Sequence, residues 1–482
     1  MGYLETFLLD IKTAFLPEII IFGFIIINIL LTLFCNKKYY KLSQWIAILG
    51  ILTAFASIGF IQAEPTYYAF FNNLAENIYT VFFKSLILIA SFFTVLNSYK
   101  VVRQKKGRSF IYFLVMFGAI LASLLLISAN NLLFIFLANG LLGISNTILL
   151  VTTKNYSAKE SALKYFGGMI VAFGLYLFGT SYIYGICGDV DLGCISAFLT
   201  NYQGSMLLAA AVLLITAALL YNVFAAPFLN YVPDVFKGAS YPVGMFLSLI
   251  PVISGFAVLV KVLSVFKNYV PFFDIIMITI ALLTIAYGAY GACRQTDIKR
   301  FMGYGGIVHS GFMVMVTGIL SPYSLAGLLY YLISYLFINV AMWAGITMFY
   351  DATGRSDIES YRGLAYNNPF YTTVMVFVLV ALAGLPPTSG FLAKFFVFSS
   401  VARLGFIYVG FLLIAMILNV VSVGFYLKPM KIMFEKTSET LSLVNKRVFS
   451  KFSLYFCAGI TLLLFVASDK IAEFCELIAY SF

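Results

Sequence analysis

Residues 370–399 read FYTTVMVFVLVALAGLPPTSGFLAKFFVFS, a long apolar stretch that contains a pair of prolines and one lysine. A bilayer core about 30 Å thick is crossed by roughly 20 apolar residues in a helix, so this stretch is long enough to cross it. Proline removes a helical hydrogen bond and clashes with the preceding turn. We therefore predict a membrane-spanning helix that is broken at Pro386 and Pro387 and carries Lys394 beyond the break.

Similar apolar stretches follow one another along the whole chain. Of the 482 residues, 62% are hydrophobic and only 10% are charged, which excludes a water-soluble core. Lipid offers no partner to backbone groups, and the stretches lack the alternation of barrel strands, so helices are expected. We predict an all-α polytopic membrane protein with about 14 transmembrane helices, near residues 15–35, 43–62, 77–98, 110–128, 131–151, 162–185, 205–228, 241–266, 271–293, 301–320, 323–349, 370–399, 404–427 and 448–467.

The basic residues predict the orientation of these helices. Of the 30 Lys and Arg residues, 23 lie in the connections that follow odd-numbered helices. The other connections and the termini hold only Lys12, Lys261, Lys267, Arg403 and Lys470. Because basic loops stay in the cytoplasm, both termini are expected on the outer, periplasmic side of a bacterial inner (plasma) membrane, which fits the lack of a transit peptide. The same bias explains the net charge of +11 without a nucleic-acid partner.

The chain offers few ligands for metals or redox groups. Its single histidine, His309, excludes bis-histidine haem, and no strand is predicted to precede a phosphate-binding loop. Cys187 and Cys194 share one loop and form either a disulfide or two free thiols. The cysteines show no CxxC spacing, so zinc, iron–sulfur and c-type haem sites lack ligands; they stand at positions 35, 187, 194, 293, 457 and 475. We expect no cofactor and no metal in this chain.

The order of the apolar segments suggests an internal repeat. Helices 4–8 (110–266) and 9–13 (271–427) are five each, which gives the two sets opposite orientations. Each set has a helix interrupted by proline, at Pro227 in AAPFLNYVPD and at the Pro-Pro pair in GLPPTSGF. Inverted repeats with one discontinuous helix in each half are typical of transporters, although prolines are also common in membrane helices generally. The predicted domains are 1–105, inverted repeat A at 106–268, inverted repeat B at 269–435, and 436–482.

Several motifs in this order resemble one known family. They are LPEII (16–20), ESALKYF (160–166), VPDVFKGASYPVGMFLSLIPVISGFAVL (232–259), RQTDIKRFMGYGGIVHSGF (294–312), RGLAYNNP (362–369), GLPPTSGFLAKFFVF (384–398) and LNVVSVGFYLK (418–428). Together they resemble the N-type subunits of proton-translocating NADH:quinone oxidoreductase, respiratory complex I. The broader family includes Mrp-type cation/proton antiporter subunits and membrane-bound hydrogenase subunits.

The resemblance implies a fourteen-helix, two-repeat fold and a place in the membrane arm of a hetero-oligomer. Its partners would be the other membrane subunits of complex I and membrane lipid. NADH, FMN, iron–sulfur centres and quinone would then be held by partner subunits, with no complete active site in this chain. The chain would act as a non-redox subunit of a translocase.

The sequence departs from this family where charged residues are expected. Matched residue by residue, the helix 5 carboxylate falls at Gly140, the helix 7 lysine at Asn222 and the helix 8 lysine at Val252. Only Lys394, in broken helix 12, is present. Proton relays need groups that exchange protons, and an amide does not store one. The first half-channel is therefore predicted to lack its proton-storing pair, with Asn139 and Asn222 flanking the vacated place.

The remaining polar residues each have two interpretations. Lys394 is either part of a proton pathway or an amine that extends to the membrane interface. His309 either relays protons or hydrogen-bonds a neighbouring helix. Lys164 is either the charge at the cytoplasmic end of the family's relay or an interfacial anchor. Asn139 and Asn222 are either relay residues or interhelical hydrogen-bond partners, and Lys84 is expected to be structural.

Three functions remain open from the sequence. The first is a subunit that helps couple electron transfer from NADH to quinone to proton translocation. The second is a structural spacer of the same complex whose own pumping is lost. The third is an Mrp-type cation/proton antiporter subunit, which the missing helix 5 carboxylate disfavours.

Overall fold

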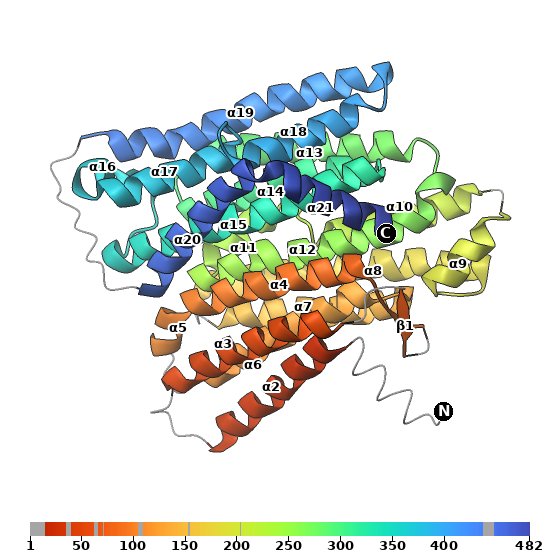
Figure 1. The fold of residues 1–482 in the computed structure, drawn as a ribbon, viewed down its shortest axis with the longest axis horizontal. Coiled ribbons are helices and arrows are strands. Elements are labelled where there is room, and N and C mark those ends of the chain that lie inside the picture. The colour runs from red at the N-terminus through yellow and green to blue at the C-terminus, as the bar shows by residue number, and fades with distance from the viewer. Residues whose placement is uncertain are drawn as a thin grey trace. The chain divides into compact units, whose positions relative to one another are not determined.

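The computed structural model describes residues 15–34, 40–61, 66–70, 72–104, 109–152, 155–202, 204–436 and 448–482. These residues are almost entirely helical (Figure 1). The chain divides into two compact units. Unit 1 comprises residues up to Val223, Leu249–Phe273 and Ser481–Phe482, and unit 2 comprises Phe224–Ser248 and Asp274–Tyr480.

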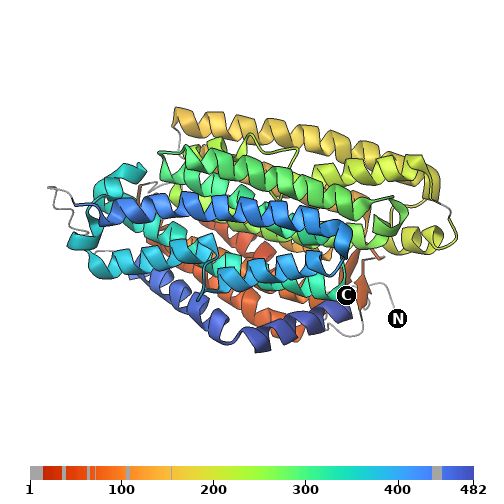
Figure 2. The same ribbon diagram turned by 90° about the horizontal axis from the view of Figure 1, so that it is seen from above.

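Unit 1 is a helical bundle with one small hairpin. Within it α8 packs against α7 and α10, and α6 packs against α2 and α7 (Figure 2). The helices are α2 (Leu16–Phe34), α3 (Tyr40–Ser57), α4 (Ile78–Asn97), α5 (Tyr99–Gln104), α6 (Ser109–Ser128), α7 (Leu132–Val151), α8 (Tyr156–Cys187), α9 (Leu192–Leu199), α10 (Met206–Leu220) and the second part of α12 (Tyr241–Phe266), with the 3₁₀ turns η2 (Ile58–Phe60) and η3 (Lys267–Tyr269).

The expectation that the chain contains no strand is wrong at one place. β1 (Tyr67–Ala69) and β2 (Leu74–Glu76) pair antiparallel, with Tyr67 opposite Glu76. The tight connection places Phe70 and Asn72 at positive φ, 51° and 66°. Strands of three residues leave too short an alternation for a sequence pattern to reveal.

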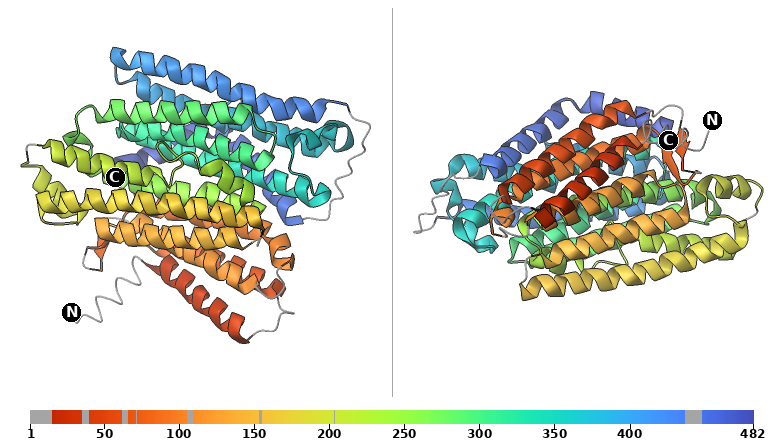
Figure 3. Two further views of the ribbon diagram at one scale, coloured as in Figure 1. Left: turned by 180° about the vertical axis from the view of Figure 1, so that it is seen from behind. Right: turned by 90° about the horizontal axis from the view of Figure 1, so that it is seen from below.

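Unit 2 is built around two buried helices, α14 and α15. α15 packs against α18 and α20, and α11 packs against α14 (Figure 3). The helices are α11 (Val232–Gly238), the first part of α12, α13 (Phe273–Cys293), α14 (Ile298–Thr317), α15 (Pro322–Thr353), α16 (Leu364–Asn367), α17 (Pro369–Ala383), α18 (Ser389–Ala402), α19 (Val409–Phe434), α20 (Val448–Val466) and α21 (Ser468–Ser481), with the 3₁₀ turns η4 (Ile358–Tyr361) and η5 (Phe406–Tyr408).

The helices confirm an all-α polytopic membrane protein. Every predicted apolar segment contains a helix, and eleven helices of the described residues are long and apolar enough to cross a membrane. One predicted position is wrong, because Lys261 lies inside α12 rather than in a connection. The helix continues to Phe266 since the lysine is the only polar residue in the surrounding sequence VLVKVL.

Both predicted breaks are present. In one, α10 ends at Leu220 and the next helix begins at Val232, with Pro227 in between. In the other, α17 ends at Ala383, and Gly384 follows at φ 76°, the left-handed conformation that commonly ends a helix. Pro386 and Pro387 separate it from α18.

The two units share one local arrangement at corresponding places in the sequence. An isolated antiparallel bridge joins Asn131 to Asp191 in unit 1, and another joins Asp297 to Asp357 in unit 2. Adding 166 to 131 and 191 gives 297 and 357. The flanking backbone hydrogen bonds correspond in the same way: Leu132 N to Val190 O (2.9 Å), Leu192 N to Asn130 O (3.0 Å), Ile298 N to Ser356 O (3.0 Å) and Ile358 N to Thr296 O (2.8 Å).

The close approach of α18 to the end of α17 predicts that Gly390 tolerates no side chain. A Cβ at this position would overlap the backbone carbonyl of Ala381, which is fixed by its own helix. Overpacking of this kind costs about 1–3 kcal/mol. We expect Gly390→Ala to lower the thermal stability of the detergent-solubilised protein, measured by size-exclusion chromatography after heating. Gly424→Ala, where a Cβ meets no atom within 4 Å, is the control, and equal stability of the two variants would contradict this packing.

Candidate functional site

Lys394 lies on α18 and is 2% exposed, and its amine reaches back to the break between α17 and α18. Its amine donates to the carbonyl of Ala383 at 2.8 Å and to Asn419 Oδ1 at 2.8 Å. The last carbonyls of a helix lack helical partners and carry its negative dipole end. Lys394 therefore stabilises the end of α17 from inside unit 2, and its amine does not extend to the surface of the chain.

His309 lies in the middle of α14 and is 3% exposed. Its Nδ1 is 2.8 Å from the hydroxyl of Tyr331, and its Nε2 is 3.2 Å from the hydroxyl of Tyr426. A neutral imidazole has one donor and one acceptor nitrogen, and a tyrosine hydroxyl is both donor and acceptor. The three side chains thus form a hydrogen-bonded chain of exchangeable protons.

Two helices bring the lysine and histidine groups together. The amine of Lys394 lies 5.0 Å from the ring centroid of Phe312, which is three residues after His309 on the same face of α14. Asn419 and Tyr426, one partner of each group, are seven residues apart on one face of α19. The sequence candidates Lys394 and His309, each with its own hydrogen-bond partners, are therefore neighbours in the interior of unit 2, and we call these residues together the Lys394 and His309 network.

Asn139 and Asn222 form a second buried pair, in unit 1. Asn222 Nδ2 donates to Asn139 Oδ1 at 2.7 Å, and the two residues are 5% and 7% exposed. Asn139 is on α7, and Asn222 lies just after α10, where the helix breaks. A Cβ on Gly255 of α12 would lie 3.0 Å from the Asn222 Cβ, so α12 packs closely against this break.

Gly140, where the resemblance places the helix 5 carboxylate, faces away from Asn222. A Cβ on Gly140 would meet the ring of Phe173 at 3.4 Å, so this position is directed toward α8. The residue opposite Asn222 is Asn139. An amide pair satisfies both partners by a neutral hydrogen bond but stores no proton. Val252 is fully buried in α12.

Lys164 is at the surface of unit 1. Its amine lies 2.7 Å from Glu160, one turn earlier on α8, and the two side chains are 41% and 51% exposed. Exposed pairs of this kind contribute about 0–1 kcal/mol. Within this chain Lys164 is not brought to the asparagine pair.

The cysteines and acidic residues of the described chain form no metal site. Cys187 and Cys194 are free thiols, and Cys35 lies outside the described residues. Backbone N–H groups of Asp191 and Val190 lower the pKa of Asp189. A hydrogen bond to Asp189 raises the pKa of the Cys194 thiol, which keeps it protonated. In the part of the chain that the structure describes, no three metal-binding side chains converge.

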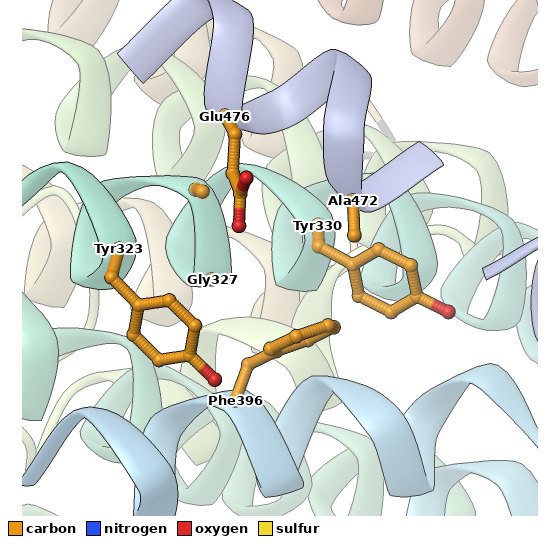
Figure 4. Close-up of a pocket in the computed structure, with 7 residues that line it drawn as sticks. Tyr323, Gly327, Tyr330, Phe396, Ala472 and Glu476 are labelled. Atoms are coloured by element: carbon orange, nitrogen blue, oxygen red, sulfur yellow. The ribbon is translucent and has the colours of Figure 1, made fainter. Parts of the chain in front are cut away.

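Unit 2 contains one small hollow among its described residues. Its volume of about 10 Å³ is room for about one water molecule, and it has one carboxylate among aromatic and small residues (Figure 4). Binding sites usually have several converging polar groups, which this hollow lacks. Its lining residues are Tyr323, Ala326, Gly327, Tyr330, Phe396, Ala472 and Glu476.

Sequence reasoning missed a buried charge cluster in unit 1. The amine of Lys84 forms ion pairs with Glu18, at 2.6 Å, and with Glu76, and all three are buried. The amine of Lys261 donates to the carbonyls of Ile127, at 2.6 Å, and Ala129, at 3.1 Å. The available signal was an acidic residue at the start of one apolar segment and a lysine inside another. Glu18 and Lys84 lie on α2 and α4, which are far apart in the sequence, and the hairpin β1–β2 adds Glu76.

Broken helices and buried ionisable groups define the transporter class of membrane protein. The family model described as NADH:quinone oxidoreductase/Mrp antiporter, transmembrane region, matches residues 129–422. The chain therefore belongs to this family, which confirms the resemblance seen in the sequence.

Individual relatives agree with this membership. The chain is 31% identical to NADH-quinone oxidoreductase subunit N of Parvibaculum lavamentivorans over 392 residues, 80% of this chain and 81% of that protein. It is 29% identical to NADH-quinone oxidoreductase subunit N of Trichlorobacter lovleyi, with 88% of each chain covered. Its fold is similar to a chain of respiratory complex I from Thermus thermophilus with bound aureothin, with a TM-score of 0.80 and 24% identity over 95% and 98% of the two chains.

The asparagine pair generates a double-mutant prediction. A lysine at position 222 would be a buried charge without a partner. Leaving a buried charge uncompensated costs about 3–5 kcal/mol. We expect Asn222→Lys to reduce the amount of folded protein in membranes, and Asn139→Glu in the same chain to restore it. Gly140→Glu with Asn222→Lys is the control, because that carboxylate faces Phe173. Equal rescue by both glutamates would contradict the placement of Asn139 opposite Asn222.

Proposed function

We propose that this chain is a membrane-arm subunit of a proton-translocating NADH:quinone oxidoreductase, of the N type. It helps to couple electron transfer from NADH to quinone, in partner subunits, to proton translocation. Two relatives that share most of its length are named as subunit N of that enzyme. The observation that carries a part in proton movement is the buried network of Lys394 and His309 at the α17–α18 break.

In this mechanism the amine of Lys394 holds or releases a proton while its surroundings stay in place. Both of its hydrogen-bond acceptors in the described chain are neutral oxygens, so no carboxylate fixes its charge. A nearby positive charge then favours release of the proton and a nearby negative charge favours its uptake. His309 and the two tyrosine hydroxyls offer exchange partners on the adjoining helices. Lys164, Asn139 and Asn222 are proposed as further positions of the proton pathway, in unit 1, where the two amides store no proton.

The structural spacer remains the second candidate, because one specific observation favours it. The place of an opposite-charged pair in unit 1 is taken by the neutral pair Asn139 and Asn222. An Mrp-type antiporter is the weaker alternative, since it requires that charged pair within one subunit.

The proposal extends to the number of membrane spans and to the internal repeat. We propose fourteen membrane spans, with inverted repeats at 106–268 and 269–435 and flanking parts at 1–105 and 436–482. The paired bridges 166 residues apart and the two broken helices support the repeat. NADH, FMN, iron–sulfur centres and quinone are assigned to partner subunits, and the chain is a non-redox subunit of a translocase.

Lys394 provides the test of this function. We expect the chain to co-purify with the iron–sulfur subunits, and Lys394→Ala to assemble but to translocate protons several-fold less per NADH oxidised in vesicles. NADH oxidation with an artificial acceptor should persist, because the redox groups are elsewhere. Lys470→Ala, at an exposed lysine, is the control. Unchanged pumping by an assembled Lys394→Ala complex would remove Lys394 from the mechanism and favour the spacer.

Orientation is tested by labelling of single cysteines. Lys105, in a connection that the basic residues assign to the cytoplasm, lies outside the described residues, so Arg355 is the better probe. In a variant whose native cysteines are serine, Arg355→Cys should react with an impermeant maleimide only in inverted vesicles. Lys470→Cys should react only in intact cells with a permeable outer membrane. The reverse pattern would invert the topology.

A further inference from the structure

We propose that Glu18, Glu76, Lys84 and Lys261, the outer-end cluster, form a second proton-exchange site in which Glu18 takes up and releases the proton. This inference rests on the proposed function, because the site would matter for a chain that moves protons. All four residues belong to unit 1. The cluster is separate from the Lys394 and His309 network, which lies in unit 2.

The first step is the unequal support of the two carboxylates. Glu76 contacts Lys84, accepts from Ser128 Oγ at 2.5 Å and accepts from Thr80 Oγ1 at 2.8 Å. Among the described residues, the ion-pair partner of Glu18 is Lys84, and neither Glu18 oxygen has a well-oriented hydrogen-bond donor. A carboxylate with several donors is stabilised in its charged form. Glu76 therefore has the better hydrogen-bonded carboxylate, and Glu18 is the carboxyl group with fewer donors, to which we assign the proton exchange.

The second step is the balance of charge. With all four groups ionised, two carboxylates face two ammonium groups and the cluster is neutral. When Glu18 binds a proton, one O–H bond forms on its carboxylate, the Glu18–Lys84 ion pair is lost, and the Lys84–Glu76 pair remains. The cluster then carries one positive charge. A single proton thus changes the electrostatic state of α2, α4 and α12 while one ion pair keeps the hairpin attached.

The third step concerns which ion the site takes. Carboxylate and hydroxyl oxygens also suit a small metal cation, but the amine of Lys84 already occupies the place between the two carboxylates. The ring of Phe15, whose centroid lies 5.2 Å from this amine, closes another side. The chemistry therefore favours a proton over Na⁺.

The fourth step is the position of the cluster in its unit. Glu18 is in the first turn of α2, Glu76 is just before α4, and Ser128 is the last residue of α6. The proposed orientation places these ends at the outer surface. Lys84 lies six residues inside α4, about 9 Å along the helix. The hydroxyl of Tyr79 donates to the carbonyl of Ala257 on α12 at 2.9 Å, so the same helix contacts both this region and the Asn222 break. We assign the cluster to proton release on the outer side.

A purely structural ion pair makes a different prediction from a proton-exchange site. The test is pH-dependent infrared difference spectroscopy of the purified complex, together with protons translocated per NADH oxidised in vesicles. We expect the wild type to show a protonated-carboxyl C=O band that titrates, Glu18→Gln to lose that band, and its vesicles to move fewer protons per NADH. Glu359→Gln, in an exposed pair with Arg362, is the matched control and should change neither readout.

Glu18→Asp guards against failure of the glutamine variant to assemble. It retains a carboxyl group beside Lys84, so the band should move in frequency and pumping should persist. An unchanged band and unchanged proton yield in Glu18→Gln would overturn the proposal, and so would failure of both variants to assemble, because the cluster would then serve folding. Co-purification of the wild-type chain with the redox subunits is read separately. If that fails, the proposed function falls, while the band still reports on Glu18.

Discussion

Buried lysine amines that donate to backbone carbonyls at helix ends are the interaction on which this structure depends. Lys394 does so at the end of α17 and Lys261 at the end of α6, and the partly exposed Lys299 makes the same kind of contact at the end of α11, with the carbonyls of Lys237 and Ala239. Lipid supplies no hydrogen-bond partner, so a helix that ends or breaks inside an apolar bundle must find donors within the protein. A lysine supplies both the donor and a charge that matches the negative end of the helix.

The same constraint explains how a charged pair can be absent from the first break. A lone buried charge is strongly destabilising, so an acid and its lysine must be replaced together. Asn139 and Asn222 satisfy each other with one hydrogen bond and leave no charge to compensate. Such a replacement preserves packing at the α10 break and removes proton storage there, and the ionisable groups elsewhere keep their partners.

The sequence predicted the features that depend on composition and on local order. Hydropathy located the helices, and the prolines located both breaks, because each is a property of one continuous segment. The outer-end cluster could not be predicted in this way, since Glu18, Lys84 and Ser128 lie on separate helices and Glu76 comes from a hairpin with strands of three residues. The sequence also did not show whether Asn139 or Gly140 faces Asn222. Adjacent residues on a helix face directions about 100° apart, and matching by family pattern alone does not resolve one position.

The distribution of buried charge bears on the choice between a coupling subunit and a spacer. A well-packed apolar replacement of a buried ion pair is often neutral or stabilising by about 1–4 kcal/mol, so a spacer gains little from retaining such pairs. This chain nevertheless keeps the four ionisable groups of the outer-end cluster buried. It also keeps Lys394 and His309 buried in unit 2. At the α10 break, by contrast, the paired side chains are neutral amides. The retained buried charges therefore favour a coupling subunit over a spacer.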